Sequence, residues 1–292
     1  MNLVYNSDIL PEAEFSLPPT DRAFQYGDGL FETIRYEAGQ LWFWADHYNR
    51  LISGMAALCL NVPEQFGQDM LGHTILKLIE RNELSNGPVR VKLQVWRQPG
   101  GLYTPTTHAA SWLLTAHPGQ PFALTDKPRL GIFRDVRLSP SRVSAFKTLN
   151  ALPYVMAGIY RQQHAFDEVV LLDTNGHLAE CVASSLFWLK DRQLFTTSLQ
   201  SGCINGIIRQ QLLRTHPVEE GLFLPDILET SDAVFCANAA GMQTLLGTLP
   251  ERVQGFMNEL GVTPKHLQHR IQRQNAQQTH YTDDGFHHRP GT

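Results

Sequence analysis

The sequence predicts a mixed α/β fold, of the α+β type, divided into two domains. Its 292 residues are about twice the length of a typical domain of roughly 150 residues. Segments with helical apolar spacing and strand-like hairpins occur in both halves. A Pro/Gly break at 118–121 separates the halves. We therefore expect domains at 1–118 and 123–265, a linker at 119–122 and a polar tail at 266–292.

The first half begins its regular structure with a hairpin and two helices. The segment 28–44 has the strand-like runs of a hairpin. Apolar residues then recur at helical spacing over 45–60, with Asp46 as the expected N-cap. A second helix is expected at 67–82, and the alternating valines of "PVRVKLQVW" predict a strand over 88–96.

The second half alternates strands with short helices. A strand is expected at 128–138, and the helix after Lys147 should hold Pro153 in its first turn. Asn175-Gly176 joins two apolar runs, which is the strongest hairpin signal in the chain. The remaining expected elements are a hairpin at 184–197, a helix at 206–216 and a buried strand from 233 into a small-residue turn.

Composition indicates a globular protein without a nucleic-acid partner. Charged residues make up 18% and hydrophobic residues 42%, which excludes a disordered chain. The net charge is −4 and the pI is near 6.3, with no basic stripe along the sequence. The four cysteines are far apart and form no C-x-x-C pair, which argues against a zinc site or a disulfide framework and suits a reducing compartment.

We expect a cytoplasmic protein without a membrane partner. The N-terminus lacks the basic region of a signal peptide. Apolar runs stay below the roughly 18 residues that a spanning helix needs. Late histidines (His269, His280, His287 and His288) lie in the predicted polar tail, so we expect no metal site there.

Two side chains suggest covalent chemistry with an aldehyde cofactor. Lys147 lies between a strand region and a proline-containing helix start. Burial would lower its pKa and make the amine a nucleophile that forms a Schiff base, although most lysines are solvated. Glu180 ends one strand of the hairpin and is followed by the uncharged run "CVASSLFW". A buried carboxylate needs a cationic partner such as a protonated pyridine nitrogen, whereas a solvated strand end is the alternative.

Two further features suggest a phosphate site. In "SGCINGIIRQQLL" the backbone N–H groups of Gly206, Ile207 and Ile208 would point out of a helix start, where anions bind. Arg50 lies off the apolar stripe of its helix, and arginine is a natural phosphate ligand. Taken singly, the first is often only a turn and the second only a solvated residue. Together with Lys147 and Glu180 they predict a pyridoxal 5'-phosphate site.

The sequence resembles the fold type IV pyridoxal-phosphate enzymes, the class IV aminotransferase family. The resemblance covers roughly residues 20 to 250. The matching blocks follow the family's order: "DRAFQYGDGLFETIR", "DHYNRL", "FKTLNALPYVMA", "DEVVLLDTNGHLAECVASSLFW", "CINGIIRQ" and "CANAAGMQ". Six blocks in order are a far more specific signal than any one of them.

The resemblance implies a fold, a dimer and a set of roles. A smaller N-terminal α/β domain would precede a larger C-terminal domain with a β-barrel-like core, and two copies would form a homodimer with the site near the interface. Lys147 would bind the cofactor and move the proton, while Glu180 would pair with the ring nitrogen. Residues implied in cofactor binding are Arg50, Lys147, Glu180, Ser184, Ile207, Ile208, Asn238 and Ala239. Asn238 stands where the family often has a phosphate-binding threonine. Residues implied in catalysis or substrate contact are Lys147, Thr33, Tyr26, Phe31 and Arg97.

The branch of the family stays open between a lyase and a transaminase. Thr33 favours a 4-amino-4-deoxychorismate lyase of folate biosynthesis, in which the corresponding threonine is thought to deliver a proton. Leu152 stands where branched-chain aminotransferases usually have tyrosine. "KTLNALP" resembles D-amino-acid aminotransferases, but Gln98 and Pro99 follow Arg97 in place of their Arg-x-His carboxylate trap. The Gly-Gly-Arg turn of the lyases appears here as Gly100-Gly101-Leu102. A third possibility is a non-catalytic relative that acts as a binding module. In each enzyme the substrate would be a small amino compound.

Overall fold

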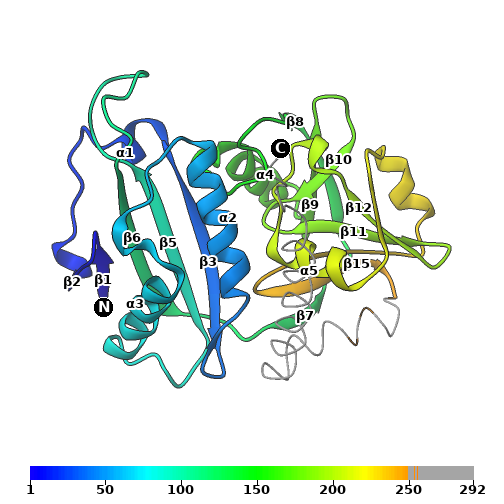
Figure 1. Cartoon of the computed structure of the whole chain (residues 1–292). Coiled ribbons are helices and arrows are strands. Elements are labelled where there is room, and N and C mark those ends of the chain that lie inside the picture. The colour runs from blue at the N-terminus through cyan, green and yellow to red at the C-terminus, as the bar shows by residue number, and fades with distance from the viewer. Residues whose placement is uncertain (249–252, 254, 256–292) are drawn as a thin grey trace, which may run out of the picture. The chain divides into compact units, whose positions relative to one another are not determined.

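An antiparallel six-stranded sheet contains the strands of the first 118 residues in the computed structural model (Figure 1). The structure describes residues 1–248, 253 and 255. In spatial order the strands are β2 (Asp8–Pro11), β1 (Asn2–Tyr5), β6 (Ala110–Pro118), β5 (Val89–Arg97), β3 (Gly29–Glu37) and β4 (Gln40–Leu41). β3 pairs with β5 from Gly29 to Tyr36, so the sheet holds the future site residues of β3 in a fixed register.

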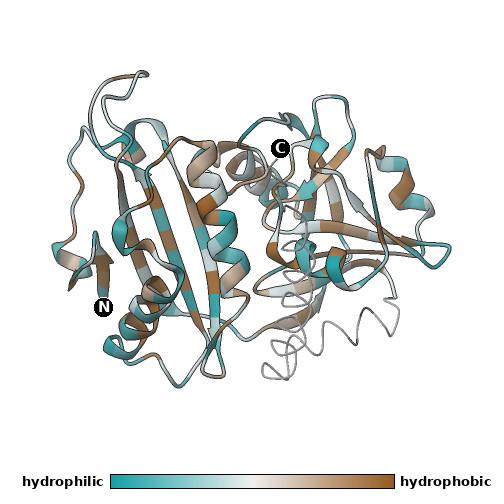
Figure 2. Ribbon diagram, in the orientation of Figure 1, coloured by the Kyte–Doolittle hydropathy of each residue, from teal (hydrophilic) through white to brown (hydrophobic). Residues whose placement is uncertain are grey.

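Two amphipathic helices, α2 (Trp44–Ala57) and α3 (Gln68–Arg81), pack on one face of this sheet (Figure 1). Leu51 and Met55 of α2 are buried one helical turn apart, and they pack in one apolar cluster with Leu30 and Ile34 of β3. Figure 2 shows the alternation of polar and apolar residues along β3 and β5. Burying each large apolar side chain stabilises the fold by roughly 1.5–3 kcal/mol. This packing fixes the position of α2, and therefore of Arg50, relative to β3.

The described strands after residue 122 form two further sheets. The three-stranded sheet contains, in order, β10 (Leu178–Cys181), β9 (Glu168–Asp173) and β8 (Leu130–Leu138). The six-stranded sheet contains, in order, β13 (Val218–Gly221), β12 (Gln193–Thr197), β11 (Ser185–Lys190), β14 (Ala233–Asn238), β15 (Gly241–Gly247) and β7 (Ala123–Asp126). Every residue of β9 and β10 is buried. Such continuous burial is typical of strands that are covered on both faces.

Short helices complete the described chain. The helix α4 (Leu152–Gln163) contacts β8 and β9, and α5 (Ile207–Thr215) contacts β14. The others are α1 (Arg22–Tyr26) and the 3-10 helices η1 (Glu12–Glu14), η2 (Glu64–Phe66), η3 (Leu199–Ser201) and η4 (Pro225–Thr230).

The α/β class and the main predicted elements are confirmed. Both predicted hairpins of the second half form, and Pro153 lies in the first turn of α4. The prediction of Asp46 as N-cap was wrong, because α2 begins earlier, after Phe43. The Asp46 carboxylate instead accepts hydrogen bonds from Gln211 Nε2 at 2.7 Å and Arg214 Nη2 at 2.5 Å. It thereby connects α2 to α5.

The strands change sheets between β6 and β7, across residues 119–122. The chain divides into two units at residue 250, and the site described below lies in the first. The proposed boundary at 119–122 stays a prediction. The polar tail at 266–292, with the four late histidines named above, lies outside the described residues, as does the predicted domain end at 265.

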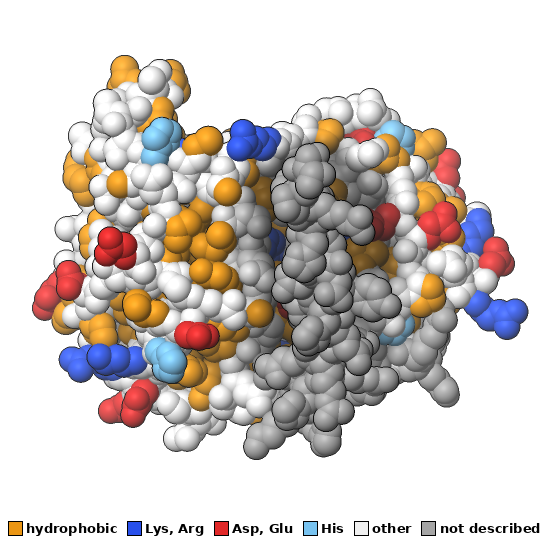
Figure 3. Space-filling model, viewed as in Figure 1, with side chains coloured by type: hydrophobic (Ala, Val, Ile, Leu, Met, Phe, Trp, Pro, Cys, Tyr) orange, Lys and Arg blue, Asp and Glu red, His pale blue; other side chains and the backbone are white. Residues whose placement is uncertain are grey.

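The face of the molecule drawn in Figure 3 carries dispersed charge. On the face in Figure 3, the lysine and arginine side chains of the described residues do not merge into one continuous patch. Within 1–248, 253 and 255, no group of three or more His, Cys, Asp or Glu side chains is arranged to hold a metal ion. No helix in the same part of the chain is long and apolar enough to cross a membrane.

Candidate active site

A cavity of about 550 Å³ brings together side chains from β3, α2, the segment before α4, β10 and α5. This volume falls within the roughly 300–1,000 Å³ of typical small-molecule sites. The predicted site residues that line it are Phe31, Thr33, Arg50, Lys147, Glu180, Ser184, Ile207, Asn238 and Ala239. These residues are distributed over more than 200 positions of sequence, from 31 to 239, so the fold and not local sequence assembles them.

Lys147 is held against β3 by backbone hydrogen bonds on either side of its own residue. The Phe31 N–H donates to Lys147 O at 2.8 Å, and the Leu149 N–H donates to Gly29 O at 2.9 Å. The Lys147 amine lies 5.1 Å from the centre of the Phe31 ring. Burial and the nearby Arg50 cation lower the pKa of Lys147, against the opposing effects of two carboxylates. The geometry and the lowered pKa both suit a nucleophilic amine.

Gly54 allows this lysine segment to lie close to α2. A Cβ at Gly54 would lie 2.8 Å from Leu30 Cδ1 and 3.1 Å from Phe146 Cγ. Phe146 immediately precedes Lys147 and packs on the apolar cluster beneath the sheet. A larger residue at position 54 would therefore displace the segment that carries the amine.

The Glu180 carboxylate is buried in β10 with one oxygen fully engaged. Its Oε1 accepts hydrogen bonds from the Tyr154 hydroxyl at 2.7 Å and from the Ile204 N–H at 3.0 Å. Burial raises the pKa of Glu180 to about 7, although these two donors and the Lys147 cation act in the opposite direction. Oε2 has no hydrogen-bond partner in the described part of the chain. An N–H group of a ligand would supply the hydrogen bond that Oε2 does not receive from the described residues.

Arg50 is held rigidly by a buried carboxylate on β3. Its Nε and Nη2 donate to the two oxygens of Glu32 at 2.7 and 2.5 Å, and Nη1 donates to Asn205 O at 2.9 Å. His47 Nδ1, one turn earlier on α2, lies 2.7 Å from the same carboxylate. Burial would raise the pKa of Glu32, but Arg50 and His47 together lower it to about 2. A guanidinium has five N–H groups, so two remain for an anion in the cavity.

The N-terminus of α5 places a partial positive charge and free backbone N–H groups at the cavity. Gly206 is its N-cap, and a Cβ there would lie 2.5 Å from Ser185 Oγ. The absence of a side chain lets Ser185 approach the helix end. The N–H groups of Ile207 and Ile208 have no partner within the helix because they belong to its first turn. They point toward the side of the helix where an anion is stabilised.

The side-chain amide of Asn238 forms three hydrogen bonds within the protein at this end of the cavity. Its Nδ2 donates to Ala183 O at 3.1 Å and to Ser184 Oγ at 3.0 Å, while Oδ1 accepts from the Ala240 N–H at 2.8 Å. Both amide protons are thus used within the protein. Ser184 accepts one of them, so its own hydroxyl proton is free to be donated to an anion.

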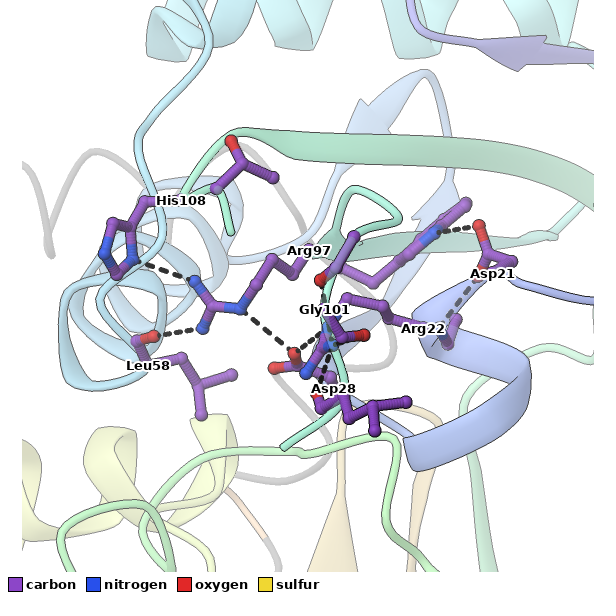
Figure 4. Close-up of polar contacts among 12 residues, drawn as sticks. Asp21, Arg22, Asp28, Leu58, Arg97, Gly101 and His108 are labelled. Atoms are coloured by element: carbon purple, nitrogen blue, oxygen red, sulfur yellow. Dashed lines mark hydrogen bonds and ion pairs between the residues drawn. The ribbon is translucent and has the colours of Figure 1, made fainter. Parts of the chain in front are cut away.

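Arg97 and Tyr26, predicted as substrate contacts, do not line the cavity, nor does the side chain of Ile208. Figure 4 shows the Arg97 guanidinium among protein partners: it donates to Asp28 Oδ2 at 3.0 Å, Leu58 O at 2.6 Å and Cys59 O at 3.3 Å, and contacts His108. Asp28 also accepts from Arg22 at 2.8 Å. Every nitrogen of Arg97 is engaged, so the structure gives its predicted substrate role no support.

Sequence reasoning left several cavity-lining residues unidentified, and His47, Tyr154 and Arg137 are the polar ones that bear most on the chemistry. Glu32, which braces Arg50, was also missed. His47 precedes Arg50 by one helical turn in "DHYNRL", and this i, i+3 spacing was the available signal. Tyr154 and Arg137 carry no local pattern that distinguishes them from core or surface residues.

The cavity thus combines an amine of lowered pKa, a carboxylate oxygen open to a cationic N–H, and an anion site made by an arginine and a helix start. These groups match a phosphorylated ligand that contains a basic ring nitrogen and an electrophilic carbon.

Comparisons with known proteins point to one family. A sequence profile of the family described as amino-transferase class IV matches residues 29–244, which include every lining residue of the cavity. The aminodeoxychorismate lyase of Vibrio harveyi is 25% identical over 83% of this chain and 96% of its own length. A D-alanine aminotransferase of Listeria monocytogenes is 27% identical over 82% of this chain and 84% of its own.

The fold also matches solved structures. The branched-chain aminotransferase of Thermoproteus uzoniensis, solved with norvaline, superposes with a TM-score of 0.82 at 20% identity, covering 91% of this chain and 97% of that one. This likeness shows a shared fold and confirms the predicted fold type.

Proposed function

We propose that this chain, which belongs to the class IV aminotransferase family, is a pyridoxal-phosphate-dependent 4-amino-4-deoxychorismate lyase. The observation that carries the proposal is the presence of Thr33 in the wall that also holds Lys147. The Thr33 hydroxyl has no hydrogen-bond partner among the described residues, so it is free to donate. A second proton donor beside the amine serves an elimination, which must protonate a leaving group, and is not required for amino transfer.

The family and the enzyme class predicted from the sequence are confirmed by this membership, and with them pyridoxal phosphate as the family's cofactor. The alternative of a non-catalytic binding module loses its basis. The identity of the substrate and the role of each residue are proposals.

The described residues fit this cofactor. Arg50, Ser184 and the N–H groups of Ile207 and Ile208 would hold the phosphate. The unpaired Oε2 of Glu180 would meet the ring nitrogen. Lys147 would form the covalent link to the aldehyde carbon. When bound, the cofactor supplies an electron sink for the carbanion formed at the substrate carbon that bears the amino group.

Two residues around the cofactor would then carry out the proton transfers: Lys147 would remove a proton from the substrate, and Thr33 would give one to the leaving group. The freed Lys147 amine takes the proton from the ring carbon that carries the substrate amine. The ether C–O bond to the enolpyruvyl group would then break. Thr33 would give its proton to the methylene carbon of the leaving group and would regain a proton from the protonated Lys147 amine, so that no net proton is gained or lost. The products are pyruvate and 4-aminobenzoate, and no oxidant or reductant is needed.

The charges near the cavity suit a substrate with two carboxylates. Arg137 lines the cavity, and its buried Nη1 has no partner in the described residues. Lys92 pairs across the sheet with Thr33, and its amine lies 5.1 Å from the centre of the Phe31 ring. Aminodeoxychorismate carries two carboxylates, and these two cations would replace the contact that Arg97 does not offer.

An amino-acid transaminase, of D-amino-acid or branched-chain type, is the second candidate. It is favoured by the similarity to a D-alanine aminotransferase. Its first steps would use the same lysine and glutamate, and a keto acid would form in place of pyruvate and 4-aminobenzoate.

One assay separates the two candidates. The purified enzyme is mixed with aminodeoxychorismate and, separately, with L- and D-amino acids plus 2-oxoglutarate. Equal amounts of pyruvate and 4-aminobenzoate support the lyase. Keto-acid formation without 4-aminobenzoate contradicts it and supports the transaminase.

We further propose a cytoplasmic homodimer that acts in folate biosynthesis. Leu152, Val155, Met156 and Ile159 lie three and four residues apart on α4 and are 39–64% exposed. Such an apolar helix face is unusual on a monomer, and α4 follows closely after Lys147. Substitution of Val155 and Ile159 by glutamate should convert a dimer to a monomer in light scattering; a wild-type monomer would contradict the proposal.

The buried free thiols of Cys181, Cys203 and Cys236 suit a reducing compartment.

A further inference from the structure

We infer that Tyr154 is a positioning residue whose hydroxyl keeps the Glu180 carboxylate ionised and turns its second oxygen toward the cavity. The inference rests on the proposed use of Glu180 as the partner of the cofactor's ring nitrogen. It assigns a role to a residue outside the set predicted from the sequence.

Two donors fix the orientation of the carboxylate. The Tyr154 hydroxyl, 2.7 Å from Oε1, comes from α4, and the Ile204 N–H, 3.0 Å from the same atom, comes from the loop before α5. With Oε1 held from two sides, Oε2 is left as the oxygen available to a ligand. Both Tyr154 and Glu180 line the cavity. The Tyr154 hydroxyl therefore orients the carboxylate that would face the ring nitrogen.

A backbone hydrogen bond and the packing of its ring anchor Tyr154. It follows Pro153 in the first turn of α4, and its N–H donates to Ala151 O at 3.1 Å. Its ring packs on the apolar cluster that contains Phe133 and Ala157. Burial and the adjacent Glu180 charge raise the pKa of Tyr154 far above its usual range. The hydroxyl therefore stays protonated and acts as a donor to the carboxylate.

Few other groups stabilise the charge on Glu180. Burial opposes it most strongly, and the cations of Lys147 and Arg50 favour it from the lysine segment and from α2. The thiols of Cys203 and of Cys181 are neutral neighbours, because burial raises the pKa of the first, and a hydrogen bond with Cys236 together with burial raises that of the second. Among the described residues, only Tyr154 and the Ile204 N–H donate hydrogen bonds to the carboxylate. Removing the tyrosine hydroxyl deletes one of these two.

The consequence concerns the location of one proton. When a ring nitrogen lies against Oε2, a single proton is shared between nitrogen and carboxylate. A carboxylate stabilised by Tyr154 is the weaker base, so the proton remains on the nitrogen and the ring keeps its positive charge. Without the hydroxyl the carboxylate becomes the stronger base and the proton moves toward it. A hydrogen bond to a charged acceptor changes such an equilibrium by roughly ten- to a hundredfold.

The test compares Tyr154→Phe with Tyr160→Phe, a matched control. Tyr160 lies on the same helix, contacts Phe133, His164 and Phe166 through its ring, and its hydroxyl has no hydrogen bond among the described residues. Both changes remove one hydroxyl from α4. Thermal denaturation of each protein establishes that it is folded.

The first arm uses the cofactor-free protein, labelled with ¹³C at the glutamate carboxyl carbons. The Glu180 resonance is identified as the one lost in Glu180→Gln, and its titration is followed by NMR. We expect a midpoint of about 7 in the wild type and in Tyr160→Phe, and a midpoint higher by roughly one to two units in Tyr154→Phe. An unchanged midpoint in folded Tyr154→Phe overturns the inference.

The second arm uses the holoenzyme loaded with pyridoxal phosphate that is ¹⁵N-labelled in the ring. We expect a pyridinium ¹⁵N shift in the wild type and in the control, and a movement toward the neutral pyridine value in Tyr154→Phe. A ring nitrogen that is unchanged in Tyr154→Phe overturns the assigned role. Failure of the wild type to take up the cofactor would instead contradict the proposed function, and the first arm would still decide whether Tyr154 controls Glu180.

If Tyr154→Phe does not fold, 3,5-difluorotyrosine at position 154, a stronger donor, should lower the Glu180 midpoint; an unchanged midpoint overturns the inference.

Discussion

The buried Glu32 carboxylate offers a quantitative test of how the arginine of the anion site is held. Glu32 is 2% exposed and accepts hydrogen bonds from Arg50 and His47. Its pKa falls from 4.5 to about 2. Because one pKa unit corresponds to about 1.4 kcal/mol, this difference contributes on the order of 3 kcal/mol to the free energy of unfolding. Glu32→Gln, which has the same shape without the charge, should lose about this amount at pH 7.

The pH dependence follows from the direction of the shift. A carboxylate whose pKa is lowered in the folded state stabilises the protein above its unfolded pKa, and this contribution is lost as the pH falls toward the folded pKa. The difference between wild type and Glu32→Gln should therefore be full above about pH 5 and should shrink as the pH falls from about 4.5 toward 2.

Urea denaturation of the cofactor-free protein at a series of pH values measures this difference. Glu37→Gln on the same strand serves as the control, since its ion pair with Arg35 is nearer the surface and should contribute less than about 1 kcal/mol. A destabilisation by Glu32→Gln of under about 1 kcal/mol at pH 7, or one that does not change with pH, would refute the reasoning.

Three further predictions follow from the same site. Thr33→Val should lower pyruvate release by roughly a hundredfold or more while the cofactor's visible absorbance is kept; unchanged turnover would exclude Thr33 as the proton donor. Gly54→Ala should press on Phe146, cost roughly 1–3 kcal/mol of stability and weaken cofactor binding, whereas Gly158→Ala, which meets no atom within 4 Å, should be neutral or stabilising in thermal denaturation. Arg137→Gln should raise KM for aminodeoxychorismate about tenfold or more with a smaller change in kcat, and an unchanged KM would show that Arg137 does not contact the substrate.

The parts of the site that sequence could predict are those with a local or family pattern. Asn175-Gly176 fixes the hairpin that presents Glu180, and Pro153 marks the start of the helix after Lys147. Glu180 and Lys147, which lie on or beside these elements, could therefore be predicted from the sequence. The start of α5 was found in the same way, because Gly206 precedes a clear helical run.

The parts that sequence could not predict depend on packing between distant elements. The burial of Glu32 with Arg50 is decided by how α2 lies on β3. The contact of Tyr154 with Glu180 is decided by how α4 lies on β8 and β9. The N-cap role predicted for Asp46 was wrong, whereas the substrate role of Arg97 stays a prediction without support from the cavity lining. Each has a plausible local role, but tertiary partners on α5 and around Asp28 engage their side chains instead.

The most direct test of the account is the identity of the lysine that binds the cofactor. The holoenzyme is reduced with borohydride, which fixes a lysine-bound pyridoxyl group permanently, and its peptides are mapped by mass spectrometry. We expect the modification at Lys147 alone, and its loss together with the visible absorbance in Lys147→Ala. Modification at another lysine such as Lys92, or an unmodified Lys147 peptide from a yellow protein, would contradict it.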